Sequence, residues 1–315
     1  MLRHLLRTSD LSPADLARLL SLAAEFKREP YRARERLRSE TVVLYFNKPS
    51  TRTRISFETA VARLGATPIG VGPGDLQLGR GETIEDTART LSRYARAFVV
   101  RTYAHADVER FAEASTIPVV NALTDAHHPC QSLADLLTLR ERCGELRKLR
   151  VAYVGAGNNV AHSLIEAAAL AGMRLAVATP ERYAPDPAVV AGAARMGRAT
   201  GAALELGGDP RAAVRGADAV YTDTWLSMGD PEAERAERLA ALRPYQVDAA
   251  LLSVARPDAI FMHCLPQHRG EEVAADVVDG PRSVVFDQAE NRLHTEVAVL
   301  SALLDGALEG SAWPS

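Results

Sequence analysis

Short apolar runs alternate with amphipathic stretches along the whole chain. The apolar runs, rich in valine, leucine and alanine, predict strands at 41–46, 67–71, 95–102, 117–121, 149–154, 174–178, 202–206, 219–223, 260–264 and 283–286. The amphipathic stretches predict helices between them, among which are 13–30, 55–64, 128–143 and 291–308. Because strands alternate with helices, we expect an α/β fold of doubly wound, mostly parallel sheets that bind ligands at the carboxyl ends of their strands.

The alternation restarts after a short polar stretch at 144–148. The 315 residues are enough for two domains, each with its own hydrophobic core. We therefore expect a first domain at residues 1–145 and a second that begins at 146. The last predicted helix has an apolar face that includes Val297, Leu300 and Leu304, so this helix must pack against another part of the protein.

Composition and charge exclude several classes of protein. Hydrophobic residues make up 47% of the chain and the formal net charge is −3, which gives no overall preference for nucleic acid or an anionic membrane. Three widely spaced cysteines form neither a metal knuckle nor a disulfide framework. The first ten residues lack the apolar core of a signal peptide, and no apolar run reaches the length of a membrane span. We expect a cytoplasmic protein.

The segment Ser50-Thr51-Arg52-Thr53-Arg54 lies between a predicted strand and a predicted helix. Hydroxyl groups, guanidinium groups and backbone N–H groups at a helix start are suited to bind a dianionic phosphate, and the helix dipole adds to the attraction. In the alternative interpretation, Ser50 or Thr51 only caps the helix and both arginines lie on a solvated face.

A second loop, Gly155-Ala156-Gly157, follows a predicted strand and precedes a helix, as in nucleotide-binding oxidoreductases. Position 160 is valine where the fingerprint has a glycine. The next strand ends at 178–180 without an acidic residue for a ribose. An oxidoreductase therefore remains only a distant alternative.

Five motifs follow one another along the chain: Ser50-Thr51-Arg52-Thr53-Arg54, His128-Pro129-Cys130-Gln131, Asp223-Thr224-Trp225-Leu226-Ser227-Met228-Gly229, His263-Cys264-Leu265-Pro266 and Glu290-Asn291-Arg292. In this order and at these separations they resemble the aspartate/ornithine carbamoyltransferase family. The third and fifth motifs narrow the resemblance to the branch that uses ornithine. The resemblance covers nearly the whole chain.

The resemblance implies a reaction of arginine biosynthesis. The side-chain amine of L-ornithine attacks the carbonyl carbon of carbamoyl phosphate directly, without a covalent enzyme intermediate, and gives L-citrulline and phosphate. No metal or organic cofactor is implied, so the protein orients the substrates and stabilises charge. Other acceptors, namely aspartate, putrescine or an N-acylornithine, remain alternatives, although the segment Ser227-Met228-Gly229 favours free ornithine.

The resemblance also implies the carbamoyltransferase fold and its assembly. Residues 1–145 would bind carbamoyl phosphate, residues 146–288 would bind ornithine, and a helix within 289–315 would pack back on the first domain. The expected assembly is a homotrimer or a multiple of one, in which Gln77 reaches a neighbouring subunit's site. Taken alone, Gln77 is an ordinary polar loop residue.

Carbamoyl phosphate would be bound by residues from four of the five motifs, together with Arg101 and Gln77. Arg101 would add positive charge near the phosphate and the carbonyl oxygen, His128 would donate to that oxygen, and Gln131 would accept from the carbamoyl NH2 group. The full set implied by the resemblance is Ser50, Thr51, Arg52, Thr53, Gln77, Arg101, His128, Gln131, Cys264, Leu265 and Arg292.

Ornithine would be bound by Asn159, Asp223, Ser227 and Met228. Asp223 would pair with the ammonium group, and the loop with Ser227 and Met228 would close over the site. The amine must be neutral to attack, and Asp223 and Cys264 would accept or relay its proton, with the departing phosphate as a rival base. The catalytic residues that the resemblance implies are Arg101, His128, Asp223 and Cys264.

Ala156 is one position that departs from the family pattern. The family commonly has aspartate where this chain has Ala156. An alanine side chain cannot form a hydrogen bond, so the departure bears on the order of the loop and on the placement of Asn159, not on the reaction.

Overall fold

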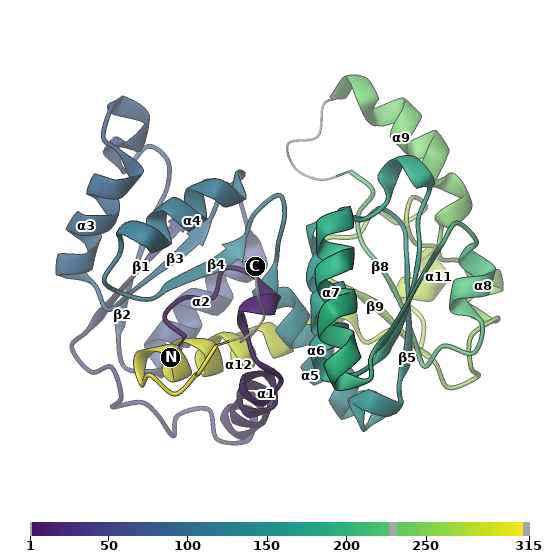
Figure 1. The fold of residues 1–315 in the computed structure, drawn as a ribbon, viewed down its shortest axis with the longest axis horizontal. Coiled ribbons are helices and arrows are strands. Elements are labelled where there is room, and N and C mark those ends of the chain that lie inside the picture. The colour runs from purple at the N-terminus through teal and green to yellow at the C-terminus, as the bar shows by residue number, and fades with distance from the viewer. Residues whose placement is uncertain (1, 227–231, 311–315) are drawn as a thin grey trace. The chain divides into compact units, whose positions relative to one another are not determined.

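The structure, a computed structural model, describes residues 2–226 and 232–310. It divides into two compact units (Figure 1). Unit 1 takes in the described residues up to Leu137 and those from Glu290 onward, and unit 2 is Thr138–Ala289. Each unit is built on one parallel sheet with helices, which confirms the expected fold class.

The sheet of unit 1 has four parallel strands in the order β2-β1-β3-β4. Its strands are β1 (Thr41–Phe46), β2 (Thr67–Val71), β3 (Ala97–Arg101) and β4 (Val119–Leu123). The central strands β1 and β3 are almost entirely buried, as expected for parallel strands covered on both faces. The chain order reverses between β1 and β3, so the loops after these strands diverge and leave room for a ligand.

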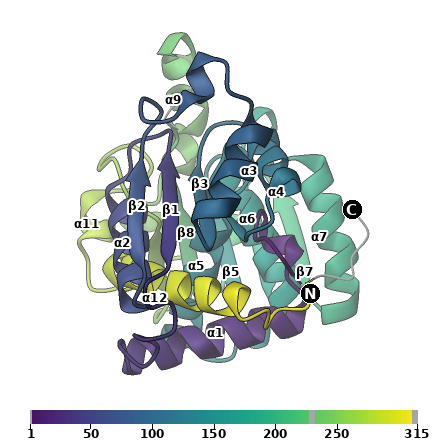
Figure 2. The ribbon, with the colours of Figure 1, turned by 90° about the vertical axis from the view of Figure 1, so that its left-hand side faces the viewer.

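The helices of unit 1 connect the strands of this sheet. They are η1 (Thr8–Asp10), α1 (Pro13–Arg28), α2 (Thr51–Arg63), η2 (Gln77–Arg80), α3 (Ile84–Tyr94), α4 (His105–Ala114) and the first part of α5 (Pro129–Cys143). Ser12 and Asp15 form a capping box at the start of α1. The last helix, α12 (Val285–Leu304), lies beside α1 (Figures 1 and 2), where Lys27 Nζ donates to Asn291 Oδ1 at 2.8 Å.

The sheet of unit 2 has five parallel strands in the order β7-β6-β5-β8-β9. Its strands are β5 (Arg150–Val154), β6 (Arg174–Ala178), β7 (Ala203–Gly207), β8 (Ala219–Thr222) and β9 (Ile260–His263). The order reverses between β5 and β8, so the loops that follow these two strands form the second candidate binding region.

The helices of unit 2 lie on both faces of its sheet (Figure 1). They are η3 (Leu146–Lys148), α6 (Asn159–Ala171), η4 (Glu181–Tyr183), α7 (Pro187–Thr200), α8 (Pro210–Val214), η5 (Glu232–Glu234), α9 (Arg235–Leu242), η6 (Arg243–Tyr245), α10 (Ala249–Leu252) and α11 (Ala275–Val278). Residues of α8, α10 and α11 form one apolar core with β5, β8 and β9. Among the helices of the described residues, none has the length and apolar composition needed to cross a bilayer.

One predicted strand is wrong. The run 283–286 makes a single bridge, between Ser283 and Phe261, and the chain then enters α12 at Val285. Both valines of this run are buried, and a short apolar run fits a strand and the first turn of a buried helix equally well. The other nine predicted strands are present, and their bounds differ from the predicted ones by at most two residues.

Candidate active site

The first polar cluster begins where β1 leads into α2. Ser50 is the N-cap of α2, and its Oγ accepts from the N–H of Thr53 at 3.2 Å. Thr51 is the first helical residue and is exposed, whereas the Thr53 side chain is buried. The capping role from the alternative interpretation is therefore real, and it holds the start of α2 at the carboxyl edge of the sheet.

The two arginines of this segment differ in position. Arg54 is exposed and its Nε donates to Glu58 Oε1 at 2.9 Å, four residues along the same helix. Arg52 is partly buried, and its charge acts on His128. Only Arg52 therefore joins the cluster at the sheet edge, and Arg54 has the solvated position of the alternative interpretation.

His128 is the point on which three guanidinium charges act. It is buried immediately before α5, and Arg101 is the last residue of β3. Burial is the main reason that the pKa of His128 lies well below its ordinary value, and the charges of Arg292, Arg101 and Arg52 lower it further. At neutral pH His128 is therefore an uncharged imidazole, able to donate one N–H without adding positive charge.

Arg292 joins three of the motifs within unit 1. Its Nη1 donates to Gln131 Oε1 at 2.9 Å, and its Nη2 donates to Thr53 Oγ1 at 3.2 Å and to Glu296 Oε1 at 2.7 Å. Gln131 Nε2 in turn donates to Asp135 Oδ1 at 2.8 Å. Neither carboxylate belongs to the five sequence motifs, although each follows its partner by four residues, the spacing at which helical side chains meet.

The second polar cluster lies in unit 2, where β8 and β9 end. Asp223 follows β8 and is 4% exposed. Its Oδ1 accepts from the Cys264 thiol at 2.9 Å, and its Oδ2 accepts from Asn158 Nδ2 at 2.6 Å. Asp223 and Cys264 thus meet as the sequence suggested. Asn158, which was not predicted, contacts Asp223, whereas Asn159 is the first residue of α6 and is half-buried.

His263 and Leu265 flank the cysteine. His263 is fully buried; its Nδ1 accepts from the Leu265 N–H at 2.9 Å, and its Nε2 lies 3.3 Å from Glu272 Oε1. Leu265 has φ of 60°, a left-handed conformation that costs a branched residue about 1–2 kcal/mol. The packed imidazole holds this strained backbone, and strain of this kind gathers at functional sites.

Both units match models of one protein family. The model "Aspartate/ornithine carbamoyltransferase, carbamoyl-P binding domain" matches residues 3–141, and "Aspartate/ornithine carbamoyltransferase, Asp/Orn binding domain" matches residues 147–303. This chain belongs to the aspartate/ornithine carbamoyltransferase family. The resemblance inferred from the five motifs is confirmed.

Relatives within this carbamoyltransferase family match over nearly the whole chain. The protein named ornithine carbamoyltransferase from Acidothermus cellulolyticus is 54% identical over 307 residues, which are 98% of each chain. A protein of the same name from a Parafrankia species is 52% identical with the same coverage. The structure titled ornithine carbamoyltransferase from Pyrococcus furiosus superposes with a TM-score of 0.92 at 49% identity, again over 98% of each chain.

The carbamoyltransferase loop that carries Ala156 is ordered without a side-chain hydrogen bond from that position. Tyr153 Oη donates to the Ala156 carbonyl at 2.9 Å and lies 3.3 Å from Asn158 Oδ1. Ala156 itself is buried against Trp225 and Leu242. Burial raises the pKa of Tyr153 well above its usual value, so its hydroxyl remains a donor. Tyrosine and apolar packing together hold this loop.

Within the part of the chain that the structure describes, two groups of side chains have the composition of metal ligands. In each, the candidate atoms lie within 4.8 Å of one another, and the groups are Asp223 with His263 and Cys264, and His268 with Glu271 and Glu272. In the first group, Asp223 already accepts two hydrogen bonds and His263 Nδ1 accepts one. These bonds fix the side chains for a role in hydrogen bonding.

Three expected residues of the carbamoyltransferase site remain, namely Gln77, Ser227 and Met228. Gln77 begins η2 and its side chain is exposed on unit 1. Ser227 and Met228 lie outside the described residues.

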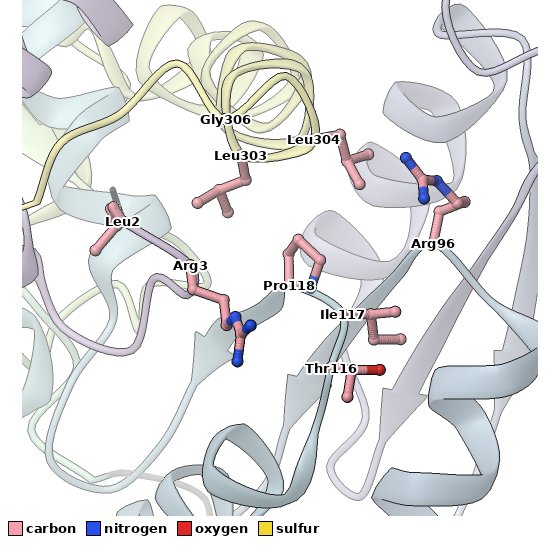
Figure 3. Close-up of a pocket in the computed structure, with 9 residues that line it drawn as sticks. All are labelled: Leu2, Arg3, Arg96, Thr116, Ile117, Pro118, Leu303, Leu304 and Gly306. Carbon is pink, nitrogen blue, oxygen red and sulfur yellow. The ribbon is translucent and has the colours of Figure 1, made fainter.

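A pocket of about 430 Å³ opens elsewhere on unit 1 (Figure 3). Leu303, Leu304, Ile117 and Pro118 form apolar parts of its wall, and its lining includes none of the expected site residues.

Proposed function

We propose that this protein transfers the carbamoyl group of carbamoyl phosphate to the side-chain amine of L-ornithine. The observation that carries the proposal is the convergence of Thr53, Gln131 and Arg292, which come from three separate motifs, in one buried hydrogen-bonded group. Relatives that bear the name ornithine carbamoyltransferase and match 98% of the chain support the choice of acceptor.

In this proposal the cluster of unit 1 binds carbamoyl phosphate. Ser50, Thr51, Arg52 and Thr53 would hold the phosphate at the start of α2, where hydroxyl groups, backbone N–H groups and a guanidinium group meet. Arg101 would add positive charge beside the phosphate. Such fixed donors stabilise the leaving dianion without reorganisation during the reaction.

The carbamoyl group would be oriented by three further residues. The neutral imidazole of His128 would donate an N–H to the carbonyl oxygen, and its low pKa keeps it uncharged at neutral pH. Gln131 Oε1 accepts one bond from Arg292 and has a second lone pair for the carbamoyl NH2 group. Arg292 would complete the pocket, and the Leu265 carbonyl would accept from the same NH2 group.

Ornithine would be bound by unit 2 through Asn159, Asp223, Ser227 and Met228. Asp223 would pair with the ammonium group of the amino acid. The neutral side-chain amine would then form the new bond to the carbonyl carbon while the bond to the phosphate oxygen breaks. The proton released by the nitrogen would go to the departing phosphate, or to Asp223 through the Cys264 thiol, which lies 2.9 Å from the carboxylate.

Several finer features belong to the same proposal. We propose domain limits of 1–145, 146–288 and 289–315, a cytoplasmic location, and a homotrimer or a multiple of one. The exposed position of Gln77 at the start of η2 leaves its side chain accessible to a neighbouring subunit.

A dinucleotide-dependent reaction is disfavoured by the loop after β5. The N–H groups of Val160 and Ala161, which would face a pyrophosphate, already donate to Asn158 Oδ1 at 3.0 and 3.1 Å. Gly157 also packs tightly, since a Cβ at this position would lie 2.3 Å from Pro185 N.

The test is the formation of ureido product from carbamoyl phosphate with L-ornithine, L-aspartate, putrescine and N-acetyl-L-ornithine offered separately. We expect product with ornithine in large excess over the others. Preference for another amine would preserve the role of unit 1 and refute that of unit 2, whereas no product with any amine would refute the proposed function.

A further inference from the structure

We propose that Glu296 is a positioning residue that holds the guanidinium group of Arg292 against Gln131 and Thr53 in the carbamoyl phosphate site. The inference rests on the function proposed above. Glu296 belongs to none of the motifs that carry the family resemblance, and it contacts Arg292 directly.

The geometry gives Glu296 control over the orientation of Arg292. The two residues lie one turn apart on α12, and they are 0% and 2% exposed. Glu296 Oε1 lies 2.7 Å from Arg292 Nη2, the same nitrogen that donates to Thr53. A guanidinium group is planar, so fixing Nη2 between two acceptors also fixes the direction in which Nη1 donates to Gln131.

Groups from three helices face the Glu296 carboxylate. On α12 the facing group is Arg292, on α2 it is the Ser56 hydroxyl, and on α5 it is the Cys130 thiol. Burial, with the charge of Glu296 as a second cause, raises the pKa of Cys130 to about 12, so this thiol stays neutral at physiological pH. Arg292 is therefore the cation that balances Glu296.

Glu296 changes charge in the neutral range. Burial raises its pKa to about 7, although Arg292 and Ser56 act in the opposite direction. Above pH 7 the ionised carboxylate holds Arg292 by charge and hydrogen bond together. Below pH 7 the neutral acid retains one accepting oxygen but loses the charge attraction, so the hold on Arg292 weakens.

The test compares Glu296→Gln and Glu296→Ala with the parent protein by steady-state kinetics between pH 6 and pH 8.5. Glutamine imitates the neutral acid, so the KM for carbamoyl phosphate at pH 8.5 should rise about threefold and lose its change near pH 7. Alanine removes the acceptor, and this KM should rise at least tenfold. The KM for ornithine should stay within twofold in both variants.

The matched control is Glu25→Gln, which removes an exposed carboxylate of unit 1 that pairs with Arg32 at 2.6 Å. It should change neither KM. A purely structural role for Glu296 would lower the yield of folded enzyme or its melting temperature, with the KM for carbamoyl phosphate and its pH profile unchanged. That result, in the nearly isosteric glutamine variant as well as in the alanine variant, would overturn the proposal.

A second measurement separates this inference from the proposed reaction. Calorimetric titration with inorganic phosphate at pH 8.5 needs no acceptor amine. We expect at least tenfold weaker phosphate binding by Glu296→Ala than by the parent protein and by Glu25→Gln. Equal binding by all three would refute the positioning role. If the parent protein forms no ureido product but Glu296→Ala still binds phosphate more weakly than the parent does, only the proposed reaction would be refuted.

Discussion

The polar clusters of the two units differ in charge and in the way they are held. In unit 1, Arg292 is fixed by three acceptors, and the charges of three arginines act on one neutral histidine. In unit 2, a buried carboxylate accepts from a thiol and an amide. A cationic cluster suits a dianionic phosphate group, whereas an anionic cluster suits an ammonium group. This difference in charge agrees with the two domain models, one for carbamoyl phosphate binding and one for aspartate or ornithine binding.

The clusters also differ in what holds them. Helix α12 brings Arg292 and Glu296 to unit 1, so the cluster there depends on helix packing and on a buried ion pair. The cluster of unit 2 depends on loops, in which Tyr153 and Asn158 hold the backbone by hydrogen bonds. A substitution in one unit should therefore leave the substrate of the other unit nearly unaffected.

The largest expected effect is on stability and concerns the ion pair of unit 1. In the folded state Glu296 has a pKa of about 7 against a reference value of 4.5. Between pH 4.5 and pH 7 the folded protein keeps a proton that the unfolded chain has released. The free energy of unfolding therefore falls as the pH rises, by about 3 kcal/mol over this range. Glu296→Gln removes this titration.

The difference in free energy of unfolding between Glu296→Gln and the parent protein should therefore shift in favour of the variant by about 3 kcal/mol from pH 4.5 to pH 7.5. Urea unfolding at several pH values measures it, with Glu25→Gln as control. A difference that stays constant with pH would show that Glu296 titrates in its ordinary range.

The next effect removes one charge from the phosphate site. A hydrogen bond to a charged group contributes about 1.5–3 kcal/mol. We therefore expect Arg52→Ala to lower kcat/KM for carbamoyl phosphate at least tenfold, with the KM for ornithine unchanged. Arg54→Ala, which loses only the exposed pair with Glu58, is the matched control. Equal kinetics for both variants would remove Arg52 from the site.

The corresponding change in unit 2 is Asp223→Asn. It keeps the shape of the side chain and removes the charge that would pair with the ammonium group. The KM for ornithine should therefore rise about tenfold, which corresponds to a loss of about 1.4 kcal/mol of binding free energy. Phosphate binding, followed by calorimetry, should not change. A loss of phosphate binding would contradict the division of roles between the two units.

The smallest effect concerns the loop that carries Ala156. Tyr153→Phe deletes the hydroxyl that donates to the Ala156 carbonyl, which should lower the free energy of unfolding by about 1 kcal/mol. Tyr221→Phe, a buried ring on the neighbouring strand, serves as a comparison. If Tyr153→Phe proved as stable as the parent protein, apolar packing alone would order this loop.

The sequence alone was sufficient for the alternation of strands and helices and for the motifs at the strand ends. Strand periodicity, the serine cap of α2 and the order of the five motifs depend on residues that are close together in the sequence or on their order. They can therefore be predicted without knowing which distant residues are in contact. The start of α12 was missed because a short run of buried valines fits a strand and a helix equally well.

Only the tertiary structure decided which side chains meet. The bonds from Arg292 to Gln131 and Thr53 join residues 161 and 239 positions apart, and no periodic pattern reports such distances. The same holds for Asn158, which faces Asp223 from 65 positions away. The charge state of Glu296 depends on burial and on neighbours from three helices, because desolvation and Coulomb attraction act through space and not along the chain.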